Sequence, residues 1–141
     1  MVRYTCLSDT GDPDAAEPFL RESSRVQAVV AYFPPADLER WGTPATRETF
    51  PAVALDPASA REYSPIHYVS ADDAPALLLH GDADALVPIL ESETMYQALS
   101  EGGVVSELVA IEGSGHGFNG NGAMRANRAM VAWFKRHLGG E

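Results

Sequence analysis

The sequence lacks the features that mark disulfide-rich, membrane-spanning and nucleic-acid-binding proteins. Its single cysteine, Cys6, cannot form an internal disulfide. No apolar run approaches the roughly 18 residues that a membrane-spanning helix needs, and the start, MVRYTCLSDT, has no apolar core like that of a signal peptide. Basic residues are scarce, because 10 Lys and Arg stand against 20 Asp and Glu, for a net charge of −10. Such a surface repels phosphate groups, so we expect no nucleic acid or membrane partner and, for the chain as written, a cytoplasmic location.

What is present is the composition of one globular domain. The 141 residues are 45% hydrophobic and 21% charged, which is enough apolar material to bury a core. Three largely apolar segments stand out, Val26–Phe33, Pro75–His80 and Val104–Ile111. The first two are continuous rather than alternating, so they predict strands covered on both faces, as in a parallel sheet, and the third is predicted to be the third strand.

Two amphipathic segments follow the second and third of these strands. A helix is predicted from Pro88 to about Ser100, and another over Ala123–Leu138. The apolar face expected for the first helix is Leu90, Met95, Ala98 and Leu99. The face expected for the second is Met130, Val131, Phe134 and Leu138. Alternating strands and helices predict an α/β domain with right-handed crossovers.

Two regions are less regular. Residues 1–24 are polar and acidic and predict an arm that precedes a domain over 25–141. Residues 36–73 form an irregular excursion, punctuated by prolines, with short helices expected around Asp37–Trp41 and Pro57–Tyr63. Its aromatic side chains are expected to pack, although they could border a substrate cleft. They are Trp41, Phe50, Tyr63 and Tyr68.

Two glycine-containing segments follow the second and third predicted strands. HGDADALVP carries Asp84, and GSGHGF carries His116. Because the carboxyl ends of parallel strands meet at one edge of a sheet, where ligands bind in such folds, we expect the two side chains to lie within hydrogen-bond reach. A carboxylate that accepts the Nδ1 proton of an imidazole holds a general base in one tautomer. The pair is two thirds of a nucleophile–His–acid triad.

Simpler interpretations exist for the same residues. Asp84 could cap the following helix, and His116 could be an ordinary turn residue. A metal site at His80, Asp82 and Asp84 is disfavoured because Gly81 breaks the extended geometry it needs, so we expect no metal. His80 is expected to be structural, at the end of its strand. Cys6 lies near no strand-to-helix turn and is not expected to be a nucleophile, and His67 and His137 are expected at the surface or in packing.

From Arg25 onward the chain resembles the C-terminal portion of an α/β-hydrolase, on the esterase and prolyl-oligopeptidase-like side of that superfamily. The resemblance rests on RVQAVVAYFPPADL, EYSPIHYVSADDAPALLLHGDADALVP and SELVAIEGSGHGF. It implies the C-terminal part of the hydrolase fold, with about three strands and flanking helices. It also implies that Asp84 is the catalytic acid and His116 the catalytic base. Members of this group hydrolyse carboxylic esters or peptides without a cofactor, so a small ester or peptide is the expected substrate of the complete enzyme.

The nucleophile of that group, which lies in G-x-S-x-G, is missing, since no Gly is followed two positions later by Ser. Ser114 lies only two residues before His116 and cannot serve as that serine. We therefore expect a truncated gene product or a piece of a longer protein, whose parent could be secreted. The isolated chain should be inactive and should self-associate through the exposed edge of Val26–Phe33. A degenerate hydrolase domain that only binds a partner is the alternative.

Overall fold

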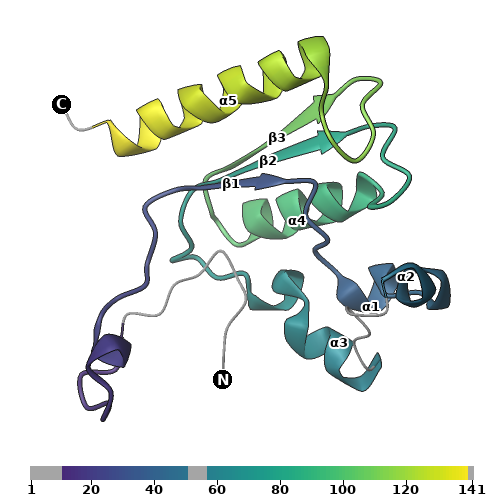
Figure 1. Cartoon of the computed structure of the whole chain (residues 1–141). Helices are drawn as coiled ribbons and strands as arrows, with labels where there is room; N and C mark the ends of the chain where they lie inside the picture. Colours follow the sequence, from purple (N-terminus) through teal and green to yellow (C-terminus); the bar gives the residue numbers. More distant parts are fainter. Residues whose placement is uncertain (1–10, 51–56, 140–141) are drawn as a thin grey trace.

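The computed structural model describes residues 11–50 and 57–139 of the chain. Its centre is a three-stranded parallel sheet in the order β1 (Val29–Tyr32), β2 (Ala76–Gly81) and β3 (Ser106–Ile111) (Figure 1). In the register, Val29 lies opposite Ala76, and Gly81 lies opposite Ile111. All three strands therefore end at the same edge of the sheet. The predicted α/β architecture with a parallel sheet is confirmed.

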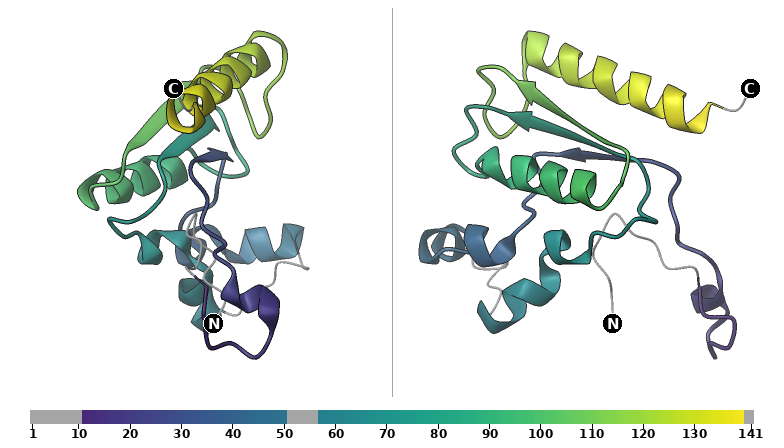
Figure 2. Two further views of the ribbon diagram at one scale, coloured as in Figure 1. Left: turned by 90° about the vertical axis from the view of Figure 1, so that its left-hand side faces the viewer. Right: turned by 180° about the vertical axis from the view of Figure 1, so that it is seen from behind.

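One helix covers each face of the sheet, α4 (Leu90–Glu101) on one side and α5 (Gly120–Leu138) on the other (Figures 1 and 2). Every residue of β2 is buried, and its side chains alternate between the two faces. One core joins Ala76 and Leu78 to Met95, Leu99 and Val104. The second core joins Leu77 and Leu79 to Ile111, Ala126 and Trp133. Cover on both faces explains why the strand is a continuous apolar run.

Some predicted boundaries were wrong. β1 begins at Val29 rather than at Val26. The N–H of Val29 donates to the carbonyl of Pro75, the residue directly before β2. Residues before Val29 therefore lie beyond the start of the neighbouring strand. Helix α4 begins two residues after Pro88, which does not occupy its first turn.

The predicted apolar faces of the two helices were partly wrong. In α4, Leu90 is exposed, whereas the polar residues Glu91 and Ser92 are buried. In α5, Val131 and Leu138 are exposed, and the buried positions are Ala126 and Trp133. Glu91 and Ser92 point inward because their polar groups bond to other elements, as described below.

The described residues of the excursion, 36–50 and 57–73, hold four short helices, which lie on the α4 side of the sheet (Figure 1). They are α1 (Leu38–Trp41), α2 (Pro44–Thr49), α3 (Pro57–Tyr63) and the 3-10 helix η3 (Pro65–Tyr68). The helices around residues 37–41 and 57–63 were predicted, and α2 was not. Buried Glu91 anchors the excursion: Oε2 accepts the N–H groups of Ala36 and Asp37, and Oε1 lies 2.7 Å from Arg40 Nε. The excursion is thereby tied to α4.

In residues 11–24, the described part of the predicted arm, there is a short 3-10 helix, η1 (Pro18–Arg21). Cys6 lies outside the described residues, and the proposed division at residue 24 stays a prediction. Across residues 11–50 and 57–139, no helix is both long and apolar enough to cross a membrane.

Candidate active site

Asp84 lies in the loop between β2 and α4, with its side chain fully buried. Its Oδ1 accepts two hydrogen bonds of 2.9 Å, from the N–H groups of Leu86 and Val87. Its Oδ2 lies 2.9 Å from Nδ1 of His116. The predicted contact between the carboxylate and the imidazole is therefore present. Asp84 does not cap α4, whose N-cap residue is Ile89, so the capping interpretation was wrong.

The pKa of Asp84 lies below its ordinary value. Burial raises it, because a charged carboxylate loses water, but the surrounding donors outweigh that effect. These donors are the N–H of Val87, the imidazole of His116 and the N–H of Leu86. The site therefore favours an ionised acid beside the imidazole.

The loop that carries His116 is joined directly to the Asp84 loop. The N–H of Ala83 donates to the carbonyl of Ser114, and the N–H of Gly113 donates to Oδ1 of Asp82 over 2.7 Å. Gly81 permits this contact, since a Cβ at that position would lie 2.1 Å from the carbonyl oxygen of Ser114. Asp82 and Ser114 therefore hold the loops together through polar contacts.

Aromatic side chains lie on one side of the imidazole of His116, which is 34% exposed. The ring of Phe33 lies 4.3 Å from it, and the ring of Phe118 lies 5.5 Å from Phe33. Phe33 has φ of 41°, a left-handed conformation that is rare for a residue other than glycine. Such outliers gather at functional sites. Within the described residues, Nε2 of His116 has no hydrogen-bond partner, so the nitrogen that would accept a proton is available.

Sequence reasoning missed Phe33 and Phe118 as parts of this site. Phe33 directly follows β1 at the edge where the other two loops begin, which is the signal that could have identified it. A hollow of about 160 Å³ lies beside these two rings and also contacts Tyr32, Ala126 and Asn127. The site is therefore bordered by two apolar rings, that of Phe33 directly after β1 and that of Phe118 in the segment before α5.

The metal interpretation of His80, Asp82 and Asp84 is wrong. Both ring nitrogens of His80 are used, with Nδ1 2.6 Å from Ser92 Oγ and Nε2 2.8 Å from the carbonyl of Val87. Asp82 is occupied by an N–H of the neighbouring loop. The structural role expected for His80 agrees with these contacts.

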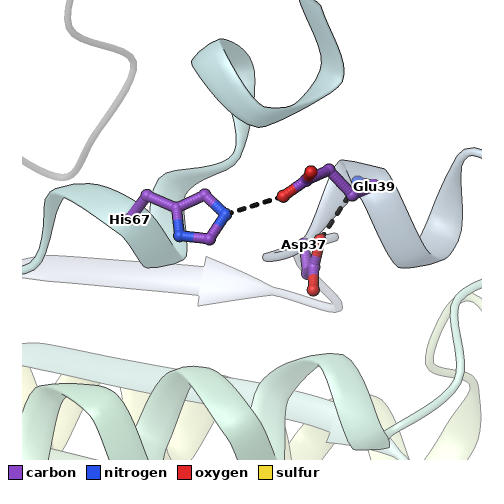
Figure 3. A group of neighbouring side chains, drawn as sticks. All are labelled: Asp37, Glu39 and His67. Carbon is purple, nitrogen blue, oxygen red and sulfur yellow. Dashed lines mark hydrogen bonds and ion pairs between the residues drawn. The ribbon is translucent and has the colours of Figure 1, made fainter. Parts of the chain in front are cut away.

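A second group of charged side chains, Asp37, Glu39 and His67, lies in the excursion (Figure 3). Their ligand-type atoms lie within 4.8 Å of one another. Asp37 turns toward the backbone of Glu39 as the N-cap of α1, and Glu39 pairs with His67 over 3.0 Å. The guanidinium of Arg61 lies 3.4 Å from Glu39 Oε2 and 3.3 Å from His67 Nε2. The positively charged guanidinium of Arg61 already lies in this space. We therefore interpret the three side chains as a helix cap and an ion pair rather than as a metal site.

Trp41 of the excursion borders a hollow beside Leu86 and Pro88, which lie in the loop between β2 and α4. Trp41 stacks on Phe50 with ring centroids 6.3 Å apart and donates its Nε1–H to the carbonyl of Leu86. The hollow has a volume of about 300 Å³, and Trp41, Thr43, Leu86 and Pro88 are among its lining residues. Trp41 therefore both packs against a neighbouring ring and lines a hollow, which are the two roles that the sequence left open for these aromatic residues.

Comparison with known proteins fits this geometry. Residues 19–141 match the model of the prolyl oligopeptidase family. The chain belongs to that family. A curated relative, the uncharacterized peptidase YuxL of Bacillus subtilis (strain 168), is 30% identical over 79 residues, which are 53% of this chain and 12% of the relative.

Solved structures of this lineage share the fold. An acetyl ester-xyloside bifunctional hydrolase from Caldicellulosiruptor lactoaceticus is 27% identical with a TM-score of 0.68, over 91% of this chain and 46% of that one. Esterase 2 of Thermogutta terrifontis, phosphoramylated by tabun, is 26% identical with a TM-score of 0.68, over 93% and 49%. A Mycobacterium tuberculosis puromycin-hydrolyzing peptidase is 28% identical with a TM-score of 0.70, over 82% and 19%. The chain thus spans less than half of each of these four proteins.

Proposed function

We propose that this chain supplies the acid and the base, Asp84 and His116, of a serine hydrolase that cleaves carboxylic esters. The observation that carries the proposal is the 2.9 Å contact between Asp84 Oδ2 and His116 Nδ1. With Nδ1–H donated to the carboxylate, Nε2 keeps its lone pair and can accept a proton. The membership in a family of serine hydrolases supports the same roles.

The serine would come from a part of the complete enzyme outside this sequence. His116 Nε2 takes the proton of its hydroxyl as the oxygen attacks the acyl carbon. The same proton then passes to the leaving alcohol, and an acyl-enzyme remains. Water, deprotonated by His116, releases the acid. Asp84 stabilises the imidazolium at both stages, with its Oδ1 fixed by two N–H groups and its Oδ2 left for the ring.

Small acyl esters are the substrates that we propose first. The solved esterases align with nearly all of this chain at 26–27% identity. The hollow beside Leu86, of about 300 Å³, has room for a short acyl or alcohol group. Peptide hydrolysis is the second candidate, favoured by the similarity to two peptidases.

The test begins with the DNA upstream of the codon for Met1, where a G-x-S-x-G segment is expected in frame or in an adjacent frame. The joined protein should hydrolyse p-nitrophenyl acetate. The variants His116→Ala and Asp84→Asn should each lower kcat by about 10⁴-fold. His67→Ala serves as the control, because His67 is an exposed histidine that pairs with Glu39 rather than with Asp84, and the kcat of this variant should be unchanged.

Retention of activity in His116→Ala would refute the proposed base. If no G-x-S-x-G segment is encoded nearby, the alternative of a binding module built on a degenerate hydrolase domain is favoured. Peptidyl p-nitroanilides, assayed beside the esters, separate the two substrate classes through their kcat/KM values.

A further inference from the structure

The imidazole of His80 is fully buried at the end of β2, directly beneath the Asp84 loop. Its Nε2 lies 2.8 Å from the carbonyl oxygen of Val87 and 3.4 Å from Oδ2 of Asp84. Its Nδ1 lies 2.6 Å from Oγ of Ser92 in α4. One ring therefore connects a central strand, the loop of the acid and the first turn of a helix.

These partners determine the tautomer of His80. A carbonyl oxygen can only accept, so Nε2 carries a proton and donates it to Val87. In the neutral ring Nδ1 then accepts the hydroxyl proton of Ser92. Both nitrogens are satisfied without water, as a buried imidazole requires. The carbonyl of Val87 thus selects the tautomer, and the hydroxyl of Ser92 complements it by donating to Nδ1.

The peptide group of Val87 links this ring to the acid. Both polar groups of the Val87 backbone are hydrogen-bonded. The N–H donates to Oδ1 of Asp84, and the C=O accepts from Nε2 of His80. The carboxylate plane of Asp84 is consequently fixed by a residue that His80 itself holds. His80 Nε2 also lies 3.4 Å from Oδ2, the oxygen that contacts His116.

We infer that His80, held by Ser92, is a positioning residue that keeps the carboxylate of Asp84 aimed at His116. The inference rests on the proposed function, because it concerns the acid of that site. The other charged groups nearby are already engaged. Glu91, next to Ser92 in α4, pairs with Arg40, and Asp82 accepts the N–H of Gly113.

The experiment follows the proton between His116 Nδ1 and Asp84 Oδ2 by ¹H and ¹⁵N NMR of the 141-residue chain. The wild type should show a downfield imidazole proton that disappears in His116→Ala. In His80→Leu, which leaves the Val87 carbonyl without its donor, the signal should be lost or should exchange about tenfold faster with water, the effect of losing one hydrogen bond. In His80→Gln, whose amide can donate to the same carbonyl, the signal should be retained.

Ser92→Ala is the second variant and decides the matter if His80→Leu does not fold. It should remove the donor to Nδ1 of His80, change the ¹⁵N shift of that nitrogen, and increase exchange of the His116 proton. Leu99→Ala is the matched control, because it opens a buried cavity at the other end of α4 and should destabilise the fold without touching the loop. Its His116 proton should be unchanged.

The outcomes separate this inference from the proposed function. If the wild type lacks the His116–Asp84 proton, the proposed pair itself fails. If the wild type shows it but His80→Leu or Ser92→Ala keeps it at the wild-type position and exchange rate, the pair stands and the role of His80 is overturned. Equal loss in Leu99→Ala would show that the signal reports only general stability, which also overturns that role.

Discussion

Replacing Gly81 with alanine tests whether the two site loops must touch through this glycine. The added Cβ would lie 2.1 Å from the carbonyl oxygen of Ser114, 2.6 Å from its carbonyl carbon and 2.7 Å from the carbonyl oxygen of Gly115. All three atoms belong to the backbone, so no side-chain rotation relieves the overlap. Forcing extra volume into a packed region costs about 1–3 kcal/mol. Parting the loops also breaks the bond from Ala83 N–H to Ser114, worth about 1 kcal/mol.

We therefore expect Gly81→Ala to lower the free energy of unfolding by about 2–4 kcal/mol, or the melting temperature by roughly 10 °C. Urea unfolding followed by circular dichroism measures the first quantity, and NMR of the His116 proton reports the loss of its contact with Asp84. Gly115→Ala is the control, since its nearest neighbouring atom is 3.8 Å away, and it should cost less than about 1 kcal/mol. An unchanged midpoint in Gly81→Ala, or equal losses in both variants, would refute the reasoning.

Three further predictions follow from the same contacts. The folded-state pKa of Asp84 is below its ordinary value, so the stabilising contribution of its carboxylate is complete above about pH 4 and is lost as pH falls through the folded pKa. The difference in the free energy of unfolding between wild type and Asp84→Asn, measured by urea unfolding, should therefore shrink in acid. A difference that stays constant with pH contradicts this prediction. Glu91→Ala should cost about 3–5 kcal/mol, because it leaves two N–H groups and Arg40 unpaired, whereas Glu91→Gln keeps an acceptor and should cost clearly less in the same assay. The isolated chain should associate through β1, one of the two outer strands of the described sheet, and should not react with a serine-directed phosphonate; light scattering that finds a monomer at all dilutions, or phosphonate labelling, contradicts these expectations.

The main features of the fold were predictable because the central strand, β2, is covered on both faces. The apolar run at β2 is continuous, and so it identified a buried parallel strand despite having no alternation. The boundaries were harder because they depend on neighbours. β1 begins at Val29 only because Pro75, 46 positions later (75 − 29 = 46), provides its first partner. No local pattern in the sequence contains that information.

The candidate site was predictable where it depends on sheet topology. Asp84 and His116 follow adjacent parallel strands, and this alone predicts that they meet. The contact of Phe33 with His116 was not predictable, because it needs a positive φ in a residue that rarely adopts one. Its position was assigned to a strand, whereas the chain turns there toward the histidine.

The failure of the hydrophobic pattern in α4 is informative in itself. The pattern assigned Leu90 to the core, yet Leu90 is exposed, and Glu91 and Ser92 are buried in its place. Burying polar groups costs free energy unless each one is bonded, and here each is: Glu91 holds the excursion and Ser92 holds His80. The helix therefore gives up apolar burial at its first turn to fix the loops beside Asp84. Because natural sequences depart from regular patterning mainly at functional or strained positions, the place where periodicity fails points to the same edge of the sheet as the glycine-containing segments.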